Sequence, residues 1–201
     1  MNPYAQGGWS NSYNPNAASN SASGWGTTPS LYGALPYSTP PVVTPELIFT
    51  FTPLDGTILN SLVIGPKSRT YFRVSTDSAS SGFTVVQNSK LESVALIEWK
   101  SHPIVEIADI VSKRSTFQWL ALSPDKTHRV MNARGKNFRW TPSEGYIELY
   151  STGVANPERF GRISQSQSGV KLELTTAAVH IGLLEVCVAS TVLLMSGRNI
   201  D

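Results

Sequence analysis

The sequence has few charges and almost no cysteine, and these absences limit what the protein can be. Of its 201 residues, 15% are charged and the formal net charge is +2, which is too balanced for nucleic-acid binding driven by bulk electrostatics. Cys187 is the one cysteine, so no intrachain disulfide can form. A glycosylation acceptor of the form Asn-x-Ser/Thr is also missing, as is a secretory signal. These features predict an intracellular, cytoplasmic protein, with peripheral membrane association as an option.

The sequence motifs of common enzyme classes are missing as well. It contains no Gly-x-Ser-x-Gly, Gly-Lys-Ser/Thr or Gly-x-Gly-x-x-Gly pattern. His102, His128 and His180 stand far apart, without the spacing that brings metal ligands together. Cys187 lies in an apolar run, where a thiol should stay protonated and inert. We therefore expect no metal, no cofactor and no catalytic residue, and an uncharacterised enzyme is the third-ranked alternative.

The first 44 residues contain no charged side chain and no histidine. They are rich in Asn, Ser, Gly, Pro and Ala with spaced Tyr and Trp residues, a composition that cannot bury enough apolar surface to fold. We predict a disordered low-complexity tail over residues 1–44 and a folded domain over residues 45–201. The tail is either a passive linker or a segment whose aromatics drive self-association.

The folded part is dominated by short stretches in which apolar and polar residues alternate. Leu47, Phe49 and Phe51 share one face of the first stretch, and Phe117 and Trp119 are expected to lie together in another. Turn residues separate about ten such stretches at intervals of about 8 to 12 residues, which is typical of a sandwich or a barrel. No strand alternates with a helical stretch, so a parallel sheet is not expected.

The strongest helical signal comes last, over residues 177–195, and this run is apolar nearly all round. A helix without a polar face must be buried on all sides. His180 and Glu185 interrupt the run, so a buried helix is favoured over a transmembrane span. If the helix starts near Ala178, Glu185 lies two turns in and needs a partner. If it starts near Gly182, as we prefer, Glu185 lies in the first turn, where the helix dipole favours it.

These patterns together predict a mainly β fold. We expect a closed antiparallel β-barrel of about ten to twelve strands, with the apolar C-terminal helix buried inside it as filler. Closure would also hide strand edges that carry little protective charge.

Several segments resemble a fungal family of domains of unknown function: IEWKSHP (97–103), FQWLAL (117–122), GKNFRWT (135–141), IELY (147–150) and LLEVCVAS (183–190). The resemblance covers about residues 46–196. That family is similar in predicted fold to the tubby C-terminal, LURP-one-related and phospholipid scramblase group, which implies a twelve-stranded barrel around a central C-terminal helix. Some tubby-like members bind phosphoinositide head groups, but no motif in this sequence carries such a site over.

Basic residues gather around one expected hairpin and form what we call the basic cluster: Lys113, Arg114, Lys126, Arg129, Arg134, Lys136 and Arg139. On adjacent strands they would make one patch that attracts anionic phospholipid, at about 1 kcal/mol for each charge near the membrane. The alternative is a solvated hairpin without a ligand. Nucleic acid is not expected, because single-stranded binders need exposed aromatics and Phe138 and Trp140 are predicted to face inward. We therefore predict a binding domain for anionic lipid or another protein, with a self-associating scaffold as the second hypothesis.

Overall fold

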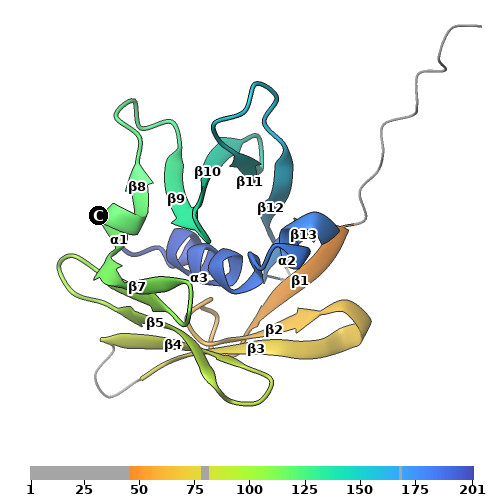
Figure 1. Ribbon diagram of the computed structural model, residues 1–201. Helices are drawn as coiled ribbons and strands as arrows, with labels where there is room; N and C mark the ends of the chain where they lie inside the picture. Colours follow the sequence, from red (N-terminus) through yellow and green to blue (C-terminus); the bar gives the residue numbers. More distant parts are fainter. Residues whose placement is uncertain (1–45, 78–81, 168) are drawn as a thin grey trace, which may run out of the picture. The chain divides into compact units, whose positions relative to one another are not determined.

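The structure is a computed structural model, and it describes residues 46–77, 82–167 and 169–201 (Figure 1). The predicted tail over residues 1–44 lies outside these residues. Within them, no helix is both long and apolar enough to cross a membrane.

The described residues form thirteen strands and a few short helices. The strands are β1 (Glu46–Pro53), β2 (Ser61–Gly65), β3 (Arg69–Thr76), β4 (Phe83–Asn88), β5 (Ser93–Glu98), β6 (Ile104–Ile107), β7 (Val111–Ser115), β8 (Leu120–Leu122), β9 (Arg129–Ala133), β10 (Lys136–Ser143), β11 (Tyr146–Ser151), β12 (Arg159–Ser166) and β13 (Gly169–Thr175). The helices are a 3-10 turn, η2 (Pro66–Ser68), and α1 (Thr116–Trp119), α2 (Thr176–His180) and α3 (Leu184–Met195).

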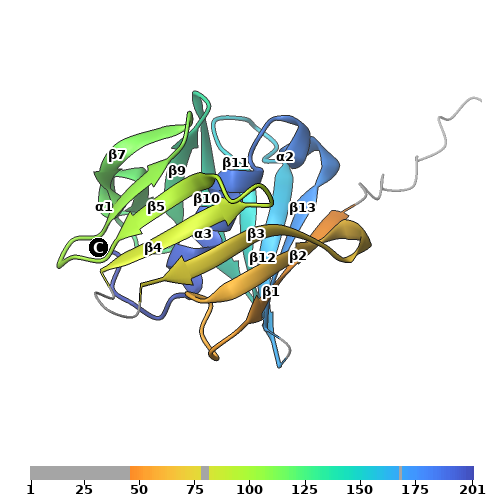
Figure 2. The same cartoon turned by 90° about the horizontal axis from the view of Figure 1, so that it is seen from below.

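All thirteen strands belong to one antiparallel sheet, in the order β7-β6-β5-β4-β3-β2-β1-β13-β12-β11-β10-β9-β8. Figure 2 shows β1 to β5 side by side along one part of it. The strands β7 and β8 are the two edges and do not pair with each other. The prediction of a closed barrel with ten to twelve strands was therefore wrong: the sheet curls but stays open. We call the place between the edges β7 and β8 the seam.

The seam stays open because the stretch expected to be one strand, residues 116–122, is divided in two. Its first half forms the single helical turn α1, and only three residues remain for β8. The indole Nε1 of Trp119 donates to the backbone oxygen of Asn132 at 3.0 Å, and Trp119 is buried. Phe117, in contrast, is 46% exposed, so these two aromatics do not share a face. The edges β7 and β8 are thus linked through α1 and share no backbone ladder.

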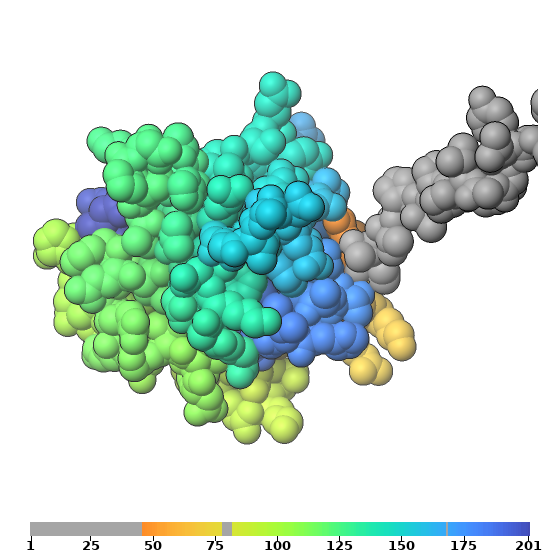
Figure 3. All heavy atoms as spheres, turned by 45° about the horizontal axis from the view of Figure 1, so that its top comes forward, coloured from red at the N-terminus to blue at the C-terminus, as the bar shows by residue number. Residues whose placement is uncertain are grey.

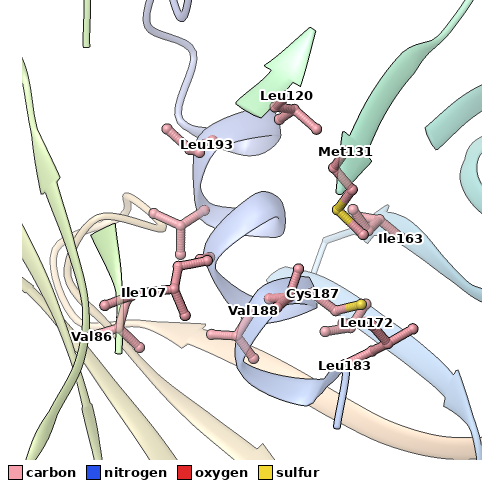
Figure 4. Packing of buried hydrophobic residues seen from close by; sticks show 14 of the residues in the cluster. Val86, Ile107, Leu120, Met131, Ile163, Leu172, Leu183, Cys187, Val188 and Leu193 are labelled. Atoms are coloured by element: carbon pink, nitrogen blue, oxygen red, sulfur yellow. The ribbon is translucent and has the colours of Figure 1, made fainter. Parts of the chain in front are cut away.

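The helix α3 lies inside the curve of the sheet, between the half that holds β2 to β5 and the half that holds β8 to β12 (Figure 1). All eight residues from Val186 to Leu193 are buried. Figure 4 shows side chains of both halves around the helix, among them Val86 and Ile107 from one side and Leu120 and Met131 from the other. The prediction of a buried C-terminal helix is confirmed.

The start of α3 also settles the position of Glu185. The apolar run is divided at Gly182, whose φ of +76° lies in the left-handed region that favours glycine. The short helix α2 ends before it, and α3 begins at Leu184, with Glu185 in its first turn. This is the preferred interpretation of the sequence, and it places the carboxylate where the helix dipole stabilises it.

The alternating patterns predict the inner face of the strands well. Val170, Leu172 and Leu174 are buried on β13, while Lys171 and Glu173 between them are partly exposed. Two strands, β2 and β7, were not expected separately. The β2 sequence, SLVIG, is nearly all apolar and does not alternate clearly, and β7 has a run of polar residues from Ser112 to Ser115.

Candidate functional site

The basic cluster is spread over several parts of the fold. Lys113 and Arg114 lie on β7, and Lys126 lies in the β8–β9 turn. Arg129 begins β9, Arg134 lies in the β9–β10 turn, and Lys136 and Arg139 lie on β10. The strand β9 has five residues, so its two ends lie about 13 Å apart at roughly 3.3 Å per residue. Lys126 and Arg129 are therefore near one end of the hairpin, and Arg134 and Lys136 are near the other.

Several members of the basic cluster are bound by the protein itself. The ammonium of Lys113 pairs with Glu98, and the side chain of Arg114 bonds to Ser112 on its own strand. Glu98 is only 5% exposed and also lies 2.7 Å from the Lys100 ammonium. Hydrogen bonds from Lys100 and Lys113 lower the pKa of Glu98. This ion pair joins β5 to the edge strand β7, and it commits Lys113 to a structural contact.

Two arginines of the cluster are held by aromatic and backbone groups. The Nε of Arg134 donates to the backbone oxygen of Gly182 at 3.1 Å, which ties the β9–β10 turn to the start of α3. The guanidinium of Arg139 lies 5.9 Å from the ring centre of Tyr150 on the neighbouring strand. These contacts leave Lys126, Lys136 and the surroundings of Arg129 as the places where an anion could meet positive charge.

A pocket of about 110 Å³ lies where Lys126 and Arg129 meet the end of the central helix. We call it the Trp140 pocket, and its lining residues are Leu122, Lys126, Thr127, His128, Arg129, Trp140, Pro142, Ile147 and Leu194. They come from β8, the β8–β9 turn, β9, β10, β11 and α3. The pocket therefore combines an apolar floor with a basic rim, and it has room for a group the size of a few water molecules.

The rim of the Trp140 pocket is shaped by the β8–β9 turn. The Ser123 hydroxyl donates to Asp125 Oδ1 at 2.5 Å and accepts from the backbone N–H groups of Thr127 and His128, both at 3.1 Å. These bonds hold Lys126 in a left-handed conformation with φ of +59°. The hydroxyl of Ser123 and the N–H of Thr127 lower the pKa of Asp125 to about 2. Because Ser123 serves the turn, it is not placed as a nucleophile beside His128.

The inner wall of the pocket is formed by two residues that lie opposite each other in the β9–β10 ladder, Arg129 and Trp140. Trp140 is 1% exposed, and its indole Nε1 has no hydrogen-bond partner among the described residues. Arg129 binds the carboxylate of Asp201 through two bonds, of 2.8 and 2.7 Å, and also donates to the backbone oxygen of Leu120. Hydrogen bonding from Arg129 lowers the pKa of Asp201.

A second charged group, on the outer face of β1, β11, β12 and β13, was not predicted. Arg159 lies 2.5 Å from Glu46 and 3.5 Å from Glu148, and Arg162 pairs with Glu173. The Tyr150 hydroxyl donates to Glu148, which raises the pKa of Tyr150. Both arginines of this group are paired with its glutamates, so the group stabilises the sheet and offers no unpaired positive charge to an anion. Its members are far apart in the sequence, and only the strand register brings them together.

Other parts of the described residues offer less to an anion, a metal ion or a thiol reaction. A hollow of about 480 Å³ lies between β1, the β12–β13 hairpin and the end of α3, and its described lining residues carry no charge. It therefore offers no counter-charge to an anion. No group of three His, Cys, Asp or Glu side chains within the described residues could hold a metal ion. Cys187 is fully buried, and this burial raises the pKa of its thiol.

Comparisons with known proteins place the chain in a family without assigning it an activity. An X-ray structure of a protein from Arabidopsis thaliana is similar over 74% of this chain and 93% of that one, with 9% sequence identity and a TM-score of 0.43. No curated protein sequence matches the chain. The model of a family of unknown function, DUF6593, matches residues 56–199. The protein therefore belongs to the DUF6593 family.

Proposed function

We propose that the domain is a non-enzymatic binding module that docks on anionic membrane lipid, with a headgroup phosphate in the Trp140 pocket. The observation that carries this proposal is the combination of basic rim, apolar floor and a buried indole N–H without a protein partner. An anion needs hydrogen-bond donors as well as positive charge. Lys126 and Arg129 offer charged donors at the pocket, and Trp140, which also lines it, carries an indole N–H without a protein partner.

A lipid suits this pocket better than a free anion does. Leu122 lies at the pocket with 37% of its surface exposed, and Phe117 on the adjoining α1 is also exposed. Apolar side chains beside basic ones are the composition of surfaces that lie at the membrane interface. A phosphoinositide-like lipid of the cytoplasmic leaflet provides the matching charge, which supports a peripheral, intracellular location.

The sequence resemblance supports the same proposal. Through the fungal family, it connects the chain with the tubby, LURP-one-related and scramblase group, some of whose members bind phosphoinositides. We propose both this relationship and a fungal origin for the chain. The self-associating tail and an interaction with another protein are alternatives that rest on composition alone.

Vesicle flotation tests the proposal with the full chain. We expect binding to phosphatidylcholine vesicles that contain a phosphatidylinositol bisphosphate and none to phosphatidylcholine alone. Replacing Lys126 with glutamine should weaken binding about fivefold, which corresponds to about 1 kcal/mol for one lysine near the membrane. Lys90→Gln, at an exposed lysine in the β4–β5 turn and outside the basic cluster, is the matched control and should change binding much less. Equal recovery of the protein with the two kinds of vesicle would refute docking on anionic lipid.

A further inference from the structure

The residues after α3 bridge the two sides of the seam. On one side, the Arg198 guanidinium lies 4.8 Å from the ring centre of Trp99, which follows β5, and Nδ1 of His102 lies 3.3 Å from the backbone oxygen of Asp201. On the other side, the Asp201 carboxylate binds Arg129 on β9. Figure 3 shows the end of the chain, in dark blue, reaching the surface beside the green segment. We call residues 196–201 the strap.

The strap binds the guanidinium of Arg129, the group of the Trp140 pocket that an anionic ligand would need most. A guanidinium presents two parallel N–H donors, and this fork fits a carboxylate and a phosphate equally well. Both of its outer donors are taken by Asp201, at 2.8 and 2.7 Å. The Arg129 side chain is 15% exposed, while that of Asp201 is 47% exposed. The carboxylate therefore covers the arginine from the solvent side, which is the side from which a headgroup would approach.

We propose that Asp201 is an internal competitor for the Trp140 pocket, so that lipid docking requires a phosphate to displace its carboxylate from Arg129. This inference rests on the function proposed above and adds its regulation. Ile200, which is 7% exposed, packs in the apolar core and anchors the strap, while the Asp201 side chain itself is 47% exposed and is held at Arg129 by an ion pair that another anion can replace. Releasing Asp201 uncovers Arg129 while Lys126 stays in its hydrogen-bonded turn. Any event that weakens the hold of the strap, such as a partner binding it, would strengthen docking.

Asp201→Asn tests the competition because it removes the charge and keeps the shape. Asp109→Asn is the matched control: it makes the same change at an exposed aspartate in the β6–β7 turn, whose φ of +59° asparagine tolerates. That turn lies at the opposite end of β6 from His102, and so away from the strap. In flotation with phosphoinositide vesicles, Asp201→Asn should bind about fivefold more strongly than wild type, and Asp109→Asn should not. Equal or weaker binding by Asp201→Asn would overturn the competition.

A second measurement uses the unaltered chain, in case Asp201→Asn does not fold. Soluble inositol trisphosphate is titrated while the carboxyl carbon of Asp201 and the backbone amides of Lys126 and His128 are followed by NMR. Displacement predicts that the Asp201 signal moves toward the position of a free carboxylate together with the amides. If the amides move and Asp201 does not, the ligand binds without displacement, so the competition is refuted while the proposed function stands. If neither vesicles nor inositol trisphosphate bind to any variant, the proposed function fails and the competition fails with it.

Discussion

Truncating Leu193 tests whether the sheet is organised around its central helix. Leu193 lies in the last turns of α3 and is 1% exposed, and Figure 4 shows it among the buried apolar side chains around the helix. Leu193→Ala removes three carbon atoms, whose transfer from water accounts for about 2.4 kcal/mol at about 0.8 kcal/mol each. The cavity left between the helix and the sheet adds to this, so we expect a loss of about 3 to 4 kcal/mol.

The matched control is Leu54→Ala in the β1–β2 connection, where the leucine is 60% exposed. With less than half of its surface buried and no cavity to create, this change should cost about 1 kcal/mol or less. Urea unfolding followed by circular dichroism gives both values, and the melting temperature of Leu193→Ala should fall by about 6 to 16 °C. If the two variants differ by less than about 1 kcal/mol, α3 is not enclosed as the structure has it.

Two further predictions concern titratable groups. Burial and the nearby charge of Glu185 raise the pKa of the Cys187 thiol. A thiol reagent should therefore label Cys187 only as fast as the domain unfolds. Labelling that is faster than unfolding would contradict its burial. The pKa of Asp125 is lowered from 3.8 to about 2 in the folded protein. The stability that this carboxylate contributes to the β8–β9 turn is therefore fully present above pH 3.8, its pKa in the unfolded chain, and is lost as the pH falls through about 2. The stability difference between wild type and Asp125→Asn should therefore shrink over that interval, and a constant difference would refute the link.

The sequence predicted the parts of the fold that depend on local patterns. Alternation predicted most strands and their inner faces, since each side chain of a strand points to the opposite face from the one before it. The apolar C-terminal run predicted its own burial, and Gly182 predicted the start of α3. These features need only neighbouring residues, so one sequence is sufficient to recognise them.

Closure of the sheet and the arrangement of the basic cluster could not be predicted in this way. The edges β7 and β8 are separated by α1, a helical turn in what alternation predicted as a strand, and its Trp119 bonds to the backbone of Asn132, which is distant in the sequence. The partners of two members of the cluster are distant in the sequence: Asp201 is 72 positions from Arg129, and Gly182 is 48 from Arg134. A pattern in a short window contains no information about such partners. The indole of Trp140 was expected to face inward, but nothing in the sequence marked it as an unpaired donor.

The open seam and the candidate site both depend on side-chain contacts rather than on backbone pairing. If β7 paired with β8, a backbone ladder would join the two edges, and its hydrogen bonds could not be exchanged for those of a ligand without breaking the sheet. Instead, the two sides are joined by α1 and by side chains of the strap, including the ion pair between Asp201 and Arg129. An ion pair that is partly exposed can exchange one anion for another at little cost to the fold, because the arginine keeps a partner throughout. The ligand exchange that we propose at the seam would therefore leave the backbone pairing of the sheet unchanged.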